Sequence, residues 1–440
     1  MLRSLKSRVL AAAAAAVIGT AAGAAFAQFV IPQVQSIGAN DLFQDIVNGA
    51  PTQPNYYASQ ALLANNSFVQ AGGLYGNALI GGDFGQNLFQ RGTSNTFSAS
   101  TTVAYTSADR WANVSGTGVP LTLSQQTGST DIVPGTTASY RVNKGSGTGT
   151  AQACVLQDLE SINSAPFAGQ TAEFSFYAKA GSTYSAANSA LNVYITYGTG
   201  TDQSSNYQAY TVTAGNAGAT GWTGGVNAAN GTAVTLSSGG FNRYAVAAAI
   251  PSTATQIGVA LCYTPVGTGT ATDWFEFAQV QLDINPALTS AVASGAVALT
   301  NDTRIKAFAR RTQALEQMLQ QRYTYIINEP PASTNLISPG YASSATNCYV
   351  TIPLPVPMRA APGAAASSVS GTTISTVTSG TTWKAVAAAV AANVSAISVY
   401  TGNSNVTANL GVTTSGATTG QFCMLQGLGG GASIIFASEM

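Results

Sequence analysis

The chain has 440 residues, enough for two or three domains with cores of their own. Only 7% of the residues are charged, and the 16 basic and 16 acidic side chains give zero net charge without a basic cluster in the body. This argues against nucleic-acid binding through phosphate neutralisation. The absence of histidine excludes a Ser-His-Asp or Cys-His nucleophile.

The first 27 residues have the layout of a secretory signal. Arg3, Lys6 and Arg8 precede an apolar stretch of Ala, Val and Ile, and an A-x-A site at 25–27 comes before Gln28. Cleavage after residue 27 is one interpretation. The alternative is a retained Ala-rich helix inside an assembly, because alanine favours helices and allows close helix contacts.

Residues 28–79 form a segment with only two charges, Asp41 and Asp45. Short helix signals alternate with Pro and Asn breaks, so the segment can hardly bury its own Phe, Tyr and Leu side chains. We interpret it as an arm that packs on a partner protein or on sister chains. An ordinary extension wrapped on the next domain is the alternative.

Residues 80–285 carry many short β-type segments separated by turn signals. In "AEFSFYAKA", Phe174 and Phe176 share one face, and polar residues alternate with them. The segment 274–282 has no purely apolar face, so this strand is either covered on both sides or bulged midway. The absence of helical periods between the strands predicts a jelly roll or another β-sandwich, and the fold class is mainly β.

The stretch "GGDFGQNLFQRGTS" at 81–94 resembles a ligand loop at first sight. It lacks a βαβ context and a lysine for phosphates, which argues against a nucleotide loop. We therefore expect it to be the first strand of the jelly roll. Gly81 and Gly82 would form the hinge, Arg91-Gly92 the turn, and the packing residues would be Phe84, Leu88 and Phe89.

The pattern changes at 286–331, which we interpret as a linker helix. Asn301 or Asp302 is its expected N-cap, two prolines stop it, and its apolar stripe comprises Ile305, Phe308, Leu315, Met318 and Leu319. The helix packs either on a sheet or against sister chains near a symmetry axis. Residues 332–440 return to Ser/Thr/Gly-rich strands with three charges and predict a second, smaller β domain.

The four cysteines lie 75 or more residues apart, so no CxxC motif occurs. Each falls within an apolar or β-type run, and we expect buried free thiols. A Cys154–Cys262 or Cys348–Cys423 disulfide is the alternative in an oxidising compartment.

Five separate segments of the sequence carry a resemblance to one known protein family. The runs "NALIGGDFGQNLFQRGTS" and "AYTSADRW", then "LQQRYTYI", "PVPMRAAP" and "IIFASEM", resemble a carbohydrate-binding-module-like jelly-roll family of bacteriophage tail fibre and virion-associated proteins. The likeness covers roughly residues 78–440. It departs from the family at the signal-like N-terminus and at Gln320, where the family has Cys.

The resemblance implies a virion structural protein: a tail fibre, spike or head fibre engaged in host attachment. It further implies a homotrimer whose arm docks on other virion proteins and whose sandwiches face outward toward host-surface glycans. Localisation would be the phage particle. The alternative is a secreted or cell-surface bacterial adhesin or glycan-binding module, which the signal-like N-terminus favours.

The candidate site residues follow from what a sugar requires. Pyranose rings stack on exposed aromatics, and the best candidates are Trp222 in a glycine-rich loop, with Tyr207 and Tyr210. Trp111 and Trp274 we expect in the core. The closest acid pairs are poorly placed for a glycosidase, so we predict no catalytic site.

Asp83 and Asp283 are the acids nearest the two ends of the predicted sandwich. Sandwiches of this type often hold a structural Ca²⁺ between the first and last strands. We therefore name these two aspartates as candidate calcium ligands, together with backbone carbonyls. No other cofactor is expected.

Overall fold

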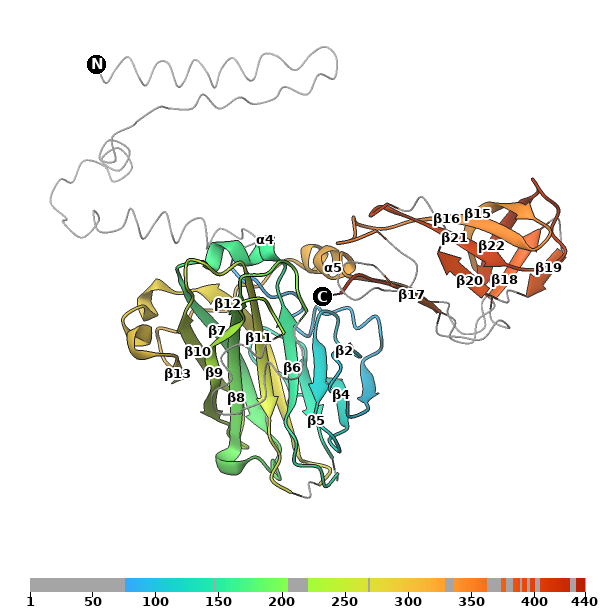
Figure 1. The fold of residues 1–440 in the computed structure, drawn as a ribbon. Coiled ribbons are helices and arrows are strands. Elements are labelled where there is room, and N and C mark those ends of the chain that lie inside the picture. The colour runs from blue at the N-terminus through green and yellow to red at the C-terminus, as the bar shows by residue number, and fades with distance from the viewer. Residues whose placement is uncertain are drawn as a thin grey trace, which may run out of the picture. The chain divides into compact units, whose positions relative to one another are not determined.

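The computed structural model describes residues 76–145, 147–204, 221–267, 270–328, 335–361, 373–376, 383–387, 390–393, 396–399, 404–427 and 433–439. The described residues belong to one compact unit, Phe68–Met440. They form several antiparallel sheets with few helices, which confirms the mainly β fold class (Figure 1). None of the described helices is long and apolar enough to span a bilayer. The segment 1–27 and almost all of the arm lie outside these residues.

Two antiparallel sheets form the sandwich. The seven-stranded sheet has the order β1 (Ser94–Phe97), β4 (Leu121–Gln126), β5 (Ser139–Asn143), β12 (Trp274–Ile284), β7 (Thr171–Ala180), β10 (Asn242–Ala249) and β13 (Val297–Thr300). The six-stranded sheet has the order β2 (Ala104–Tyr105), β3 (Ala112–Ser115), β6 (Ala153–Asp158), β11 (Gln256–Tyr263), β8 (Ala190–Gly198) and β9 (Val226–Thr235). The sheet thus continues through β13, beyond the boundary at 285 expected from sequence.

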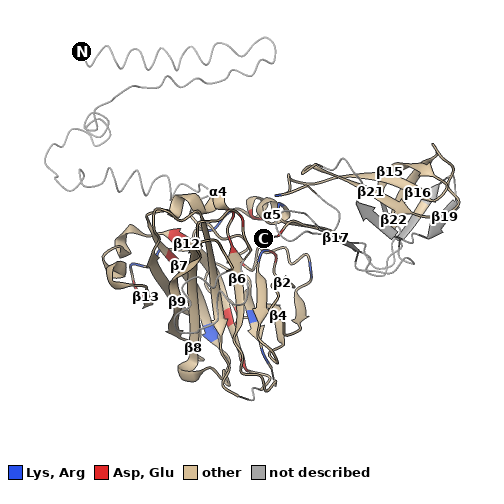
Figure 2. Cartoon of the chain, viewed as in Figure 1, with Lys and Arg blue, Asp and Glu red and all other residues tan. Residues whose placement is uncertain are grey.

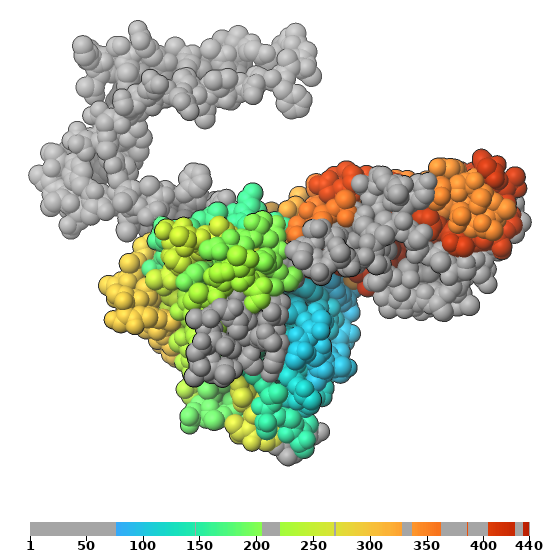
Figure 3. Space-filling view, viewed as in Figure 1, coloured from blue at the N-terminus to red at the C-terminus, as the bar shows by residue number. Residues whose placement is uncertain are grey.

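An aromatic cluster fills the centre of the sandwich. From outside, the sandwich presents a closed surface of segments from many parts of the chain (Figure 3). The ring of Phe84 lies 5.1 Å from that of Tyr140 and 5.2 Å from that of Phe277. Trp111 is fully buried beside them, as predicted. Phe174 also enters this core, which confirms the alternation read from β7.

The stretch 81–94 forms a turn and not the first strand. The amides of Gln86 and Asn87 both donate to the Asp83 carbonyl, and the first strand, β1, starts only at Ser94. Phe84 and Phe89 are buried as expected, and Leu88 is half-buried. A Cβ at Gly82 would collide with the carbonyl oxygen of Val280, so the chain approaches β12 more closely than any residue with a side chain allows.

The predicted linker helix is mostly wrong. Helix α5 covers only Gln313–Gln321, and neither Asn301 nor Asp302 caps it. Residues 301–311, called the strap below, form no helix, and their one internal backbone hydrogen bond is a turn bond from the amide of Ile305 to the carbonyl of Asp302 at 3.1 Å. Backbone groups of the strap bond instead to side chains of the sheet, so tertiary contacts override the helical periodicity of the sequence.

The C-terminal part contains two further sheets, as the β-type pattern of residues 332–440 predicts. The three-stranded sheet has the order β14 (Thr324–Asn328), β23 (Ser433–Ala437) and β17 (Thr373–Thr376). The seven-stranded sheet has the order β19 (Val390–Asn393), β18 (Trp383–Ala387), β22 (Phe422–Gly427), β15 (Asn335–Ser344), β16 (Asn347–Pro353), β21 (Thr407–Thr413) and β20 (Ala396–Val399). They share one apolar core.

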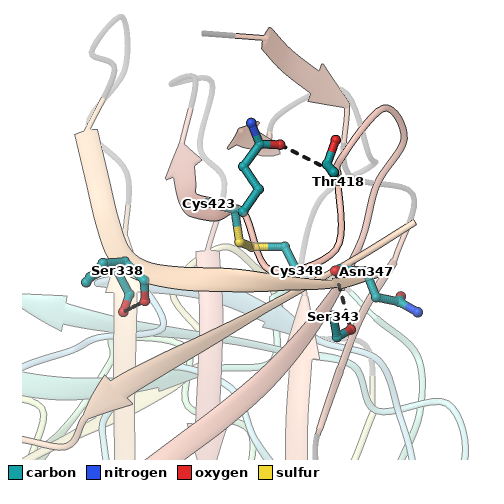
Figure 4. The surroundings of a disulfide bond; sticks show 8 residues. Ser338, Ser343, Asn347, Cys348, Thr418 and Cys423 are labelled. Atoms are coloured by element: carbon teal, nitrogen blue, oxygen red, sulfur yellow. Dashed lines mark hydrogen bonds between the residues drawn. A yellow bond between two sulfur atoms is a disulfide. The ribbon is translucent and has the colours of Figure 1, made fainter. Parts of the chain in front are cut away.

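Both cysteine pairs are disulfide-bonded, so the expectation of free thiols is wrong. Cys154 of β6 lies directly opposite Cys262 of β11 in the strand register. Cys348 of β16 and Cys423 of β22 bridge the strands on either side of β15 (Figure 4). The sequence names these pairings, but only the strand register brings the sulfur atoms together.

Charged residues are sparse on the strands (Figure 2), yet several meet in one buried network, called the joint below. Arg110 pairs with Glu439 at 2.6 Å, and its guanidinium carbon lies 3.7 Å from the centre of the Tyr323 ring. Arg91 pairs with Asp109 at 3.3 Å and with Glu439 at 3.4 Å. The joint ties the last residues of the chain to the sandwich.

The joint unites motifs that are far apart in sequence. Gln90 donates to the carbonyl of Thr324 at 2.7 Å, and Arg359 donates to the carbonyl of Ser438 at 2.6 Å. Together with Arg110 these residues come from "QRGTS", "ADRW", "QRYTYI", "PMRAAP" and "ASEM". Gln90 and Thr324 are 234 positions apart in the sequence, and Arg110 and Glu439 are 329 apart, so the joint connects distant parts of the chain.

Asp109 gives the joint a predictable pH dependence. Burial, which outweighs the attraction of Arg91, raises the pKa of Asp109 from 3.8 to about 6. Between these values the folded chain keeps a proton that the unfolded chain has lost, so the contribution of Asp109 to the free energy of unfolding falls as the pH rises. The total fall is about 3 kcal/mol.

Denaturant titrations from about pH 4 to about pH 7 on the wild type and Asp109→Asn test this expectation. The other titrating groups are common to both proteins. The free energy of unfolding of Asp109→Asn relative to the wild type should therefore rise with pH in this window. Parallel pH profiles for the two proteins would contradict the assignment.

Candidate functional site

The strap crosses the outer face of the seven-stranded sandwich sheet. The amide of Lys306 donates to the carboxylate of Glu173 at 3.1 Å, and Arg243 donates to the carbonyl of Lys306 at 2.6 Å. Asn285 holds the carbonyl of Arg304 at 2.9 Å. A polar sheet face therefore replaces the helical hydrogen bonds that this segment would otherwise make.

A pocket of about 590 Å³ opens between the strap and the sheet. The side chains that line it combine two aromatic rings with amides and cations, namely Tyr177, Phe308, Gln279, Asn301, Arg243 and Lys306. The guanidinium of Arg243 lies 5.1 Å from the centre of the Tyr177 ring. The volume of the pocket lies within the range of small-molecule sites, about 300–1,000 Å³.

A β-bulge shapes one wall of the pocket. The register of β12 against β7 shifts between Ala278 and Gln281, as the mixed faces of this strand predicted. Gln279 takes a left-handed φ of 48°, and its amide donates to the carbonyl of Pro134 at 2.8 Å. Such backbone conformations cost about 1–3 kcal/mol and concentrate at binding sites.

The two aspartates named as candidate calcium ligands lie beneath the strap, and each forms an ion pair with a basic side chain of the strap. Arg310 pairs with Asp83 at 2.6 Å, and Lys306 pairs with Asp283 at 2.8 Å. Burial raises the pKa of both carboxyls despite these partners. The described residues contain no group of three or more His, Cys, Asp or Glu that could hold a metal. The structure therefore gives these carboxylates a role in fastening the strap.

Further along the same face, Trp274 lies in a cluster of paired charges. Its ring centre is 4.1 Å from the guanidinium carbon of Arg141, and the ring is half-buried, not part of the core as predicted. Glu276 is fully buried and pairs with Arg141 at 2.8 Å and with Lys179 at 2.9 Å. Because each cation has a carboxylate partner, this cluster stabilises the sheet face beside the pocket.

The aromatic residues chosen from sequence as sugar contacts do not line the pocket. Trp222 is 96% buried, since its relative exposure is 4%. Its indole lies over Gly198 and Gly258, where Cβ atoms would approach the ring to 3.2 and 2.9 Å. The prediction of an exposed Trp222 is therefore wrong. Tyr207 and Tyr210 lie outside the described residues.

Sequence reasoning missed the aromatic lining of the pocket. In the sequence, Tyr177 alternates with the apolar residues of its strand and Phe308 belongs to a helical stripe, so neither pattern predicts a pocket-lining ring. The available signal was the predicted bulge in 274–282, because a bulge beside a polar strand face often marks a site. Ala278, where the bulge begins, is the register partner of Tyr177 on β7.

Asp158 and Glu160 are the two acids closest to each other in the sequence. Glu160 pairs with Arg322 at 3.0 Å, and the backbone carbonyl of Asp158 accepts a hydrogen bond from Arg110 at 2.7 Å. These contacts hold neighbouring elements together.

No protein-family model matches the chain, and no curated protein does. Similar solved structures include the enzymatically active domain of tailspike protein 4 of bacteriophage CBA120, at 13% identity and a TM-score of 0.26, covering 47% of this chain and 21% of that chain. The CBM22-1–GH10 modules of Clostridium thermocellum xylanase 10B, complexed with xylohexaose, have 15% identity and a TM-score of 0.22, covering 43% of this chain and 27% of that chain.

The K1 cleaved adhesin domain of Lys-gingipain from Porphyromonas gingivalis W83 has 13% identity and a TM-score of 0.17, covering 44% of this chain and 99% of that chain. This chain thus spans less than a third of the length of the tailspike and xylanase chains. At these TM-scores the similarities support no statement about function.

Proposed function

We propose that this protein is a non-enzymatic structural component of a bacteriophage virion appendage that contacts glycans on the host surface. The observation that carries the proposal is the joint. The sequence segments that resemble virion-associated jelly rolls supply its residues, including Arg110 and Glu439. A resemblance located in fold-defining contacts supports common architecture better than one scattered over the surface.

The pocket under the strap supports the glycan-contacting part of the proposal. Tyr177 and Phe308 supply ring faces for a sugar, and Gln279, Asn301 and Arg243 supply polar groups for its hydroxyls. The homotrimer and the docking of the arm on virion proteins are part of the same proposal and follow from the resemblance.

A second candidate is a secreted bacterial adhesin. The two disulfides favour it, because such bonds form in oxidising compartments and are rare in the cytosol where virions assemble. The signal-like segment before Gln28 points the same way.

Mass spectrometry of purified phage particles separates the two functions. Peptides of this chain in stoichiometric amounts, including peptides from residues 1–27, are expected for the virion protein. Recovery from the bacterial envelope without particles, with a mature N-terminus at Gln28, would overturn the proposal in favour of the adhesin.

The lining of the pocket leads to a prediction about glycan binding. Tyr177→Ala removes a ring face and should weaken binding of host-surface polysaccharide by about tenfold or more, which corresponds to about 1.4 kcal/mol. A glycan array of capsular polysaccharides and lipopolysaccharide O-chains, probed with the full chain, measures this. Tyr197→Ala is the matched control, since Tyr197 is also a half-buried tyrosine but lies on β8. Equal binding by both variants would remove the pocket from the proposal.

A further inference from the structure

Two exposed aromatic side chains lie next to each other on the seven-stranded C-terminal sheet. Tyr341 of β15 is 56% exposed and Phe422 of β22 is 58% exposed, and they are direct register partners. On the other side of β15, Tyr349 of β16 is the register partner of Tyr341, with ring centres 5.7 Å apart. The three rings therefore lie at one level across three adjacent strands.

These rings are not part of a core. The opposite face of the same strands carries Ala342, Cys348 and Cys423, all fully buried. Single exposed apolar side chains are normal on a protein surface, but large contiguous ones generally mark a contact site. Tyr341 and Phe422 are the most exposed aromatic side chains in the part of the chain whose burial the structure describes.

We propose that Tyr341 and Phe422, called the aromatic pair below, form a stacking platform for an uncharged saccharide. The negative face of an aromatic ring is complementary to the C–H groups of a pyranose ring. Neighbouring strands are about 4.8 Å apart, so the pair offers ring surface on the scale of one or two sugar units.

The surroundings favour a neutral ligand. Between residues 335 and 427 the chain has only two charged residues, Arg359 and Lys384. Arg359 is engaged with the carbonyls of Ser438 and Glu439. A charged glycan would therefore find little complementary charge here.

Polar groups suited to sugar hydroxyls occur on the same strands. Thr351, two residues beyond Tyr349 on β16 and on the same face, donates to the side-chain oxygen of Asn409 at 2.8 Å. A hydroxyl and an amide beside an aromatic surface are the groups that orient a sugar.

The size of the patch argues for a small ligand and against a second copy of the chain. An aromatic side chain buries about 150–250 Å² when fully covered, so two half-exposed rings offer roughly 200 Å². A stable protein interface needs about 800 Å² on each partner. The aromatic pair is therefore too small to hold a second copy by itself.

Saturation-transfer NMR on the full chain with maltohexaose, cellohexaose and mannohexaose tests the proposal, with an oligogalacturonate as the charged comparison. At least one neutral hexasaccharide should bind, and the oligogalacturonate should bind more weakly. Tyr341→Ala and Phe422→Ala should each weaken binding by about tenfold, whereas Tyr341→Phe keeps the ring and should retain it.

Val406→Ala is the matched control for apolar exposure, because Val406 is 46% exposed and has no ring. Tyr177→Ala is measured with the same hexasaccharides, so that binding in the strap pocket and binding at the aromatic pair are scored separately and each can fail independently. Unchanged affinity in both alanine variants, or no binding of any neutral hexasaccharide, would overturn the platform. So would self-association of the chain that Tyr341→Ala abolishes.

Discussion

Replacing Arg110 with alanine lowers the free energy of unfolding of the sandwich by about 3–5 kcal/mol. The side chain is 1% exposed and pairs with Glu439 at 2.6 Å. It also donates to the carbonyl of Asp158 at 2.7 Å and lies over the ring of Tyr323. Removing the guanidinium leaves the Glu439 carboxylate buried with a weaker partner, Arg91 at 3.4 Å, and this uncompensated charge is the larger part of the cost.

Equilibrium unfolding in urea measures the loss. The sandwich is followed by tryptophan fluorescence in a Trp383→Phe background, because Trp383 lies on β18 of the C-terminal sheet and would otherwise contribute to the signal. Arg304→Ala is the matched control, since Arg304 also pairs with a carboxylate, Asp302 at 2.7 Å, but is exposed. It should leave the midpoint unchanged. A change below about 1 kcal/mol for Arg110→Ala would mean that water reaches the joint and satisfies Glu439.

The architecture could be predicted from the sequence, whereas the contacts of the joint could not. The mainly β class, the sandwich and the smaller C-terminal β domain depend on alternation and turn signals, which are local. Phe174 and Trp111 are buried as their patterns indicate. What local patterns do not contain is that Arg91, Arg110 and Glu439 meet, because that contact joins positions more than 300 residues apart.

The candidate site could be predicted less well from the sequence, because its contacts join residues that are far apart in the chain. Trp222 is in a glycine-rich loop, a context typical of exposed residues. Its indole nevertheless packs against Gly198 and Gly258 of two other strands, where the absence of a side chain leaves room for the ring. Asp83 pairs with Arg310, which is 227 positions away, and no local pattern in the sequence predicts that pairing. Where a side chain's environment is supplied by distant segments, the residue type alone does not identify its role.

In the strap, by contrast, a strong local pattern predicts a helix, and this prediction is wrong. Its apolar spacing is helical, and Ile305 and Phe308 would share a face of that helix. Carboxylates on the sheet offer its backbone amides charge-assisted hydrogen bonds instead, such as that from Lys306 to Glu173. A helix of this length is marginal without packing, so these bonds decide the outcome.

The two disulfides should be the other large contributors to stability. The Cys154–Cys262 bond spans 108 residues and the Cys348–Cys423 bond spans 75 residues. Loop-closure entropy gives about 5 kcal/mol for the longer span and slightly less for the shorter one, within the range of about 2–5 kcal/mol measured when native disulfides are removed. Each bond lies in a separate core, so we expect the two effects to be independent.

Paired alanine replacements of both cysteines in one bond test this without leaving a lone thiol. Replacing Cys154 and Cys262 should lower only the sandwich transition, and replacing Cys348 and Cys423 should lower only the C-terminal transition. Reductant should destabilise the wild type in both transitions and each variant in only the transition that keeps its bond. Titration of four thiols in the unreduced, denatured wild type would contradict the pairing and restore the expectation of free cysteines. Because oxidised sulfurs require an oxidising compartment, the same titration on protein taken directly from its source also bears on whether the chain is exported.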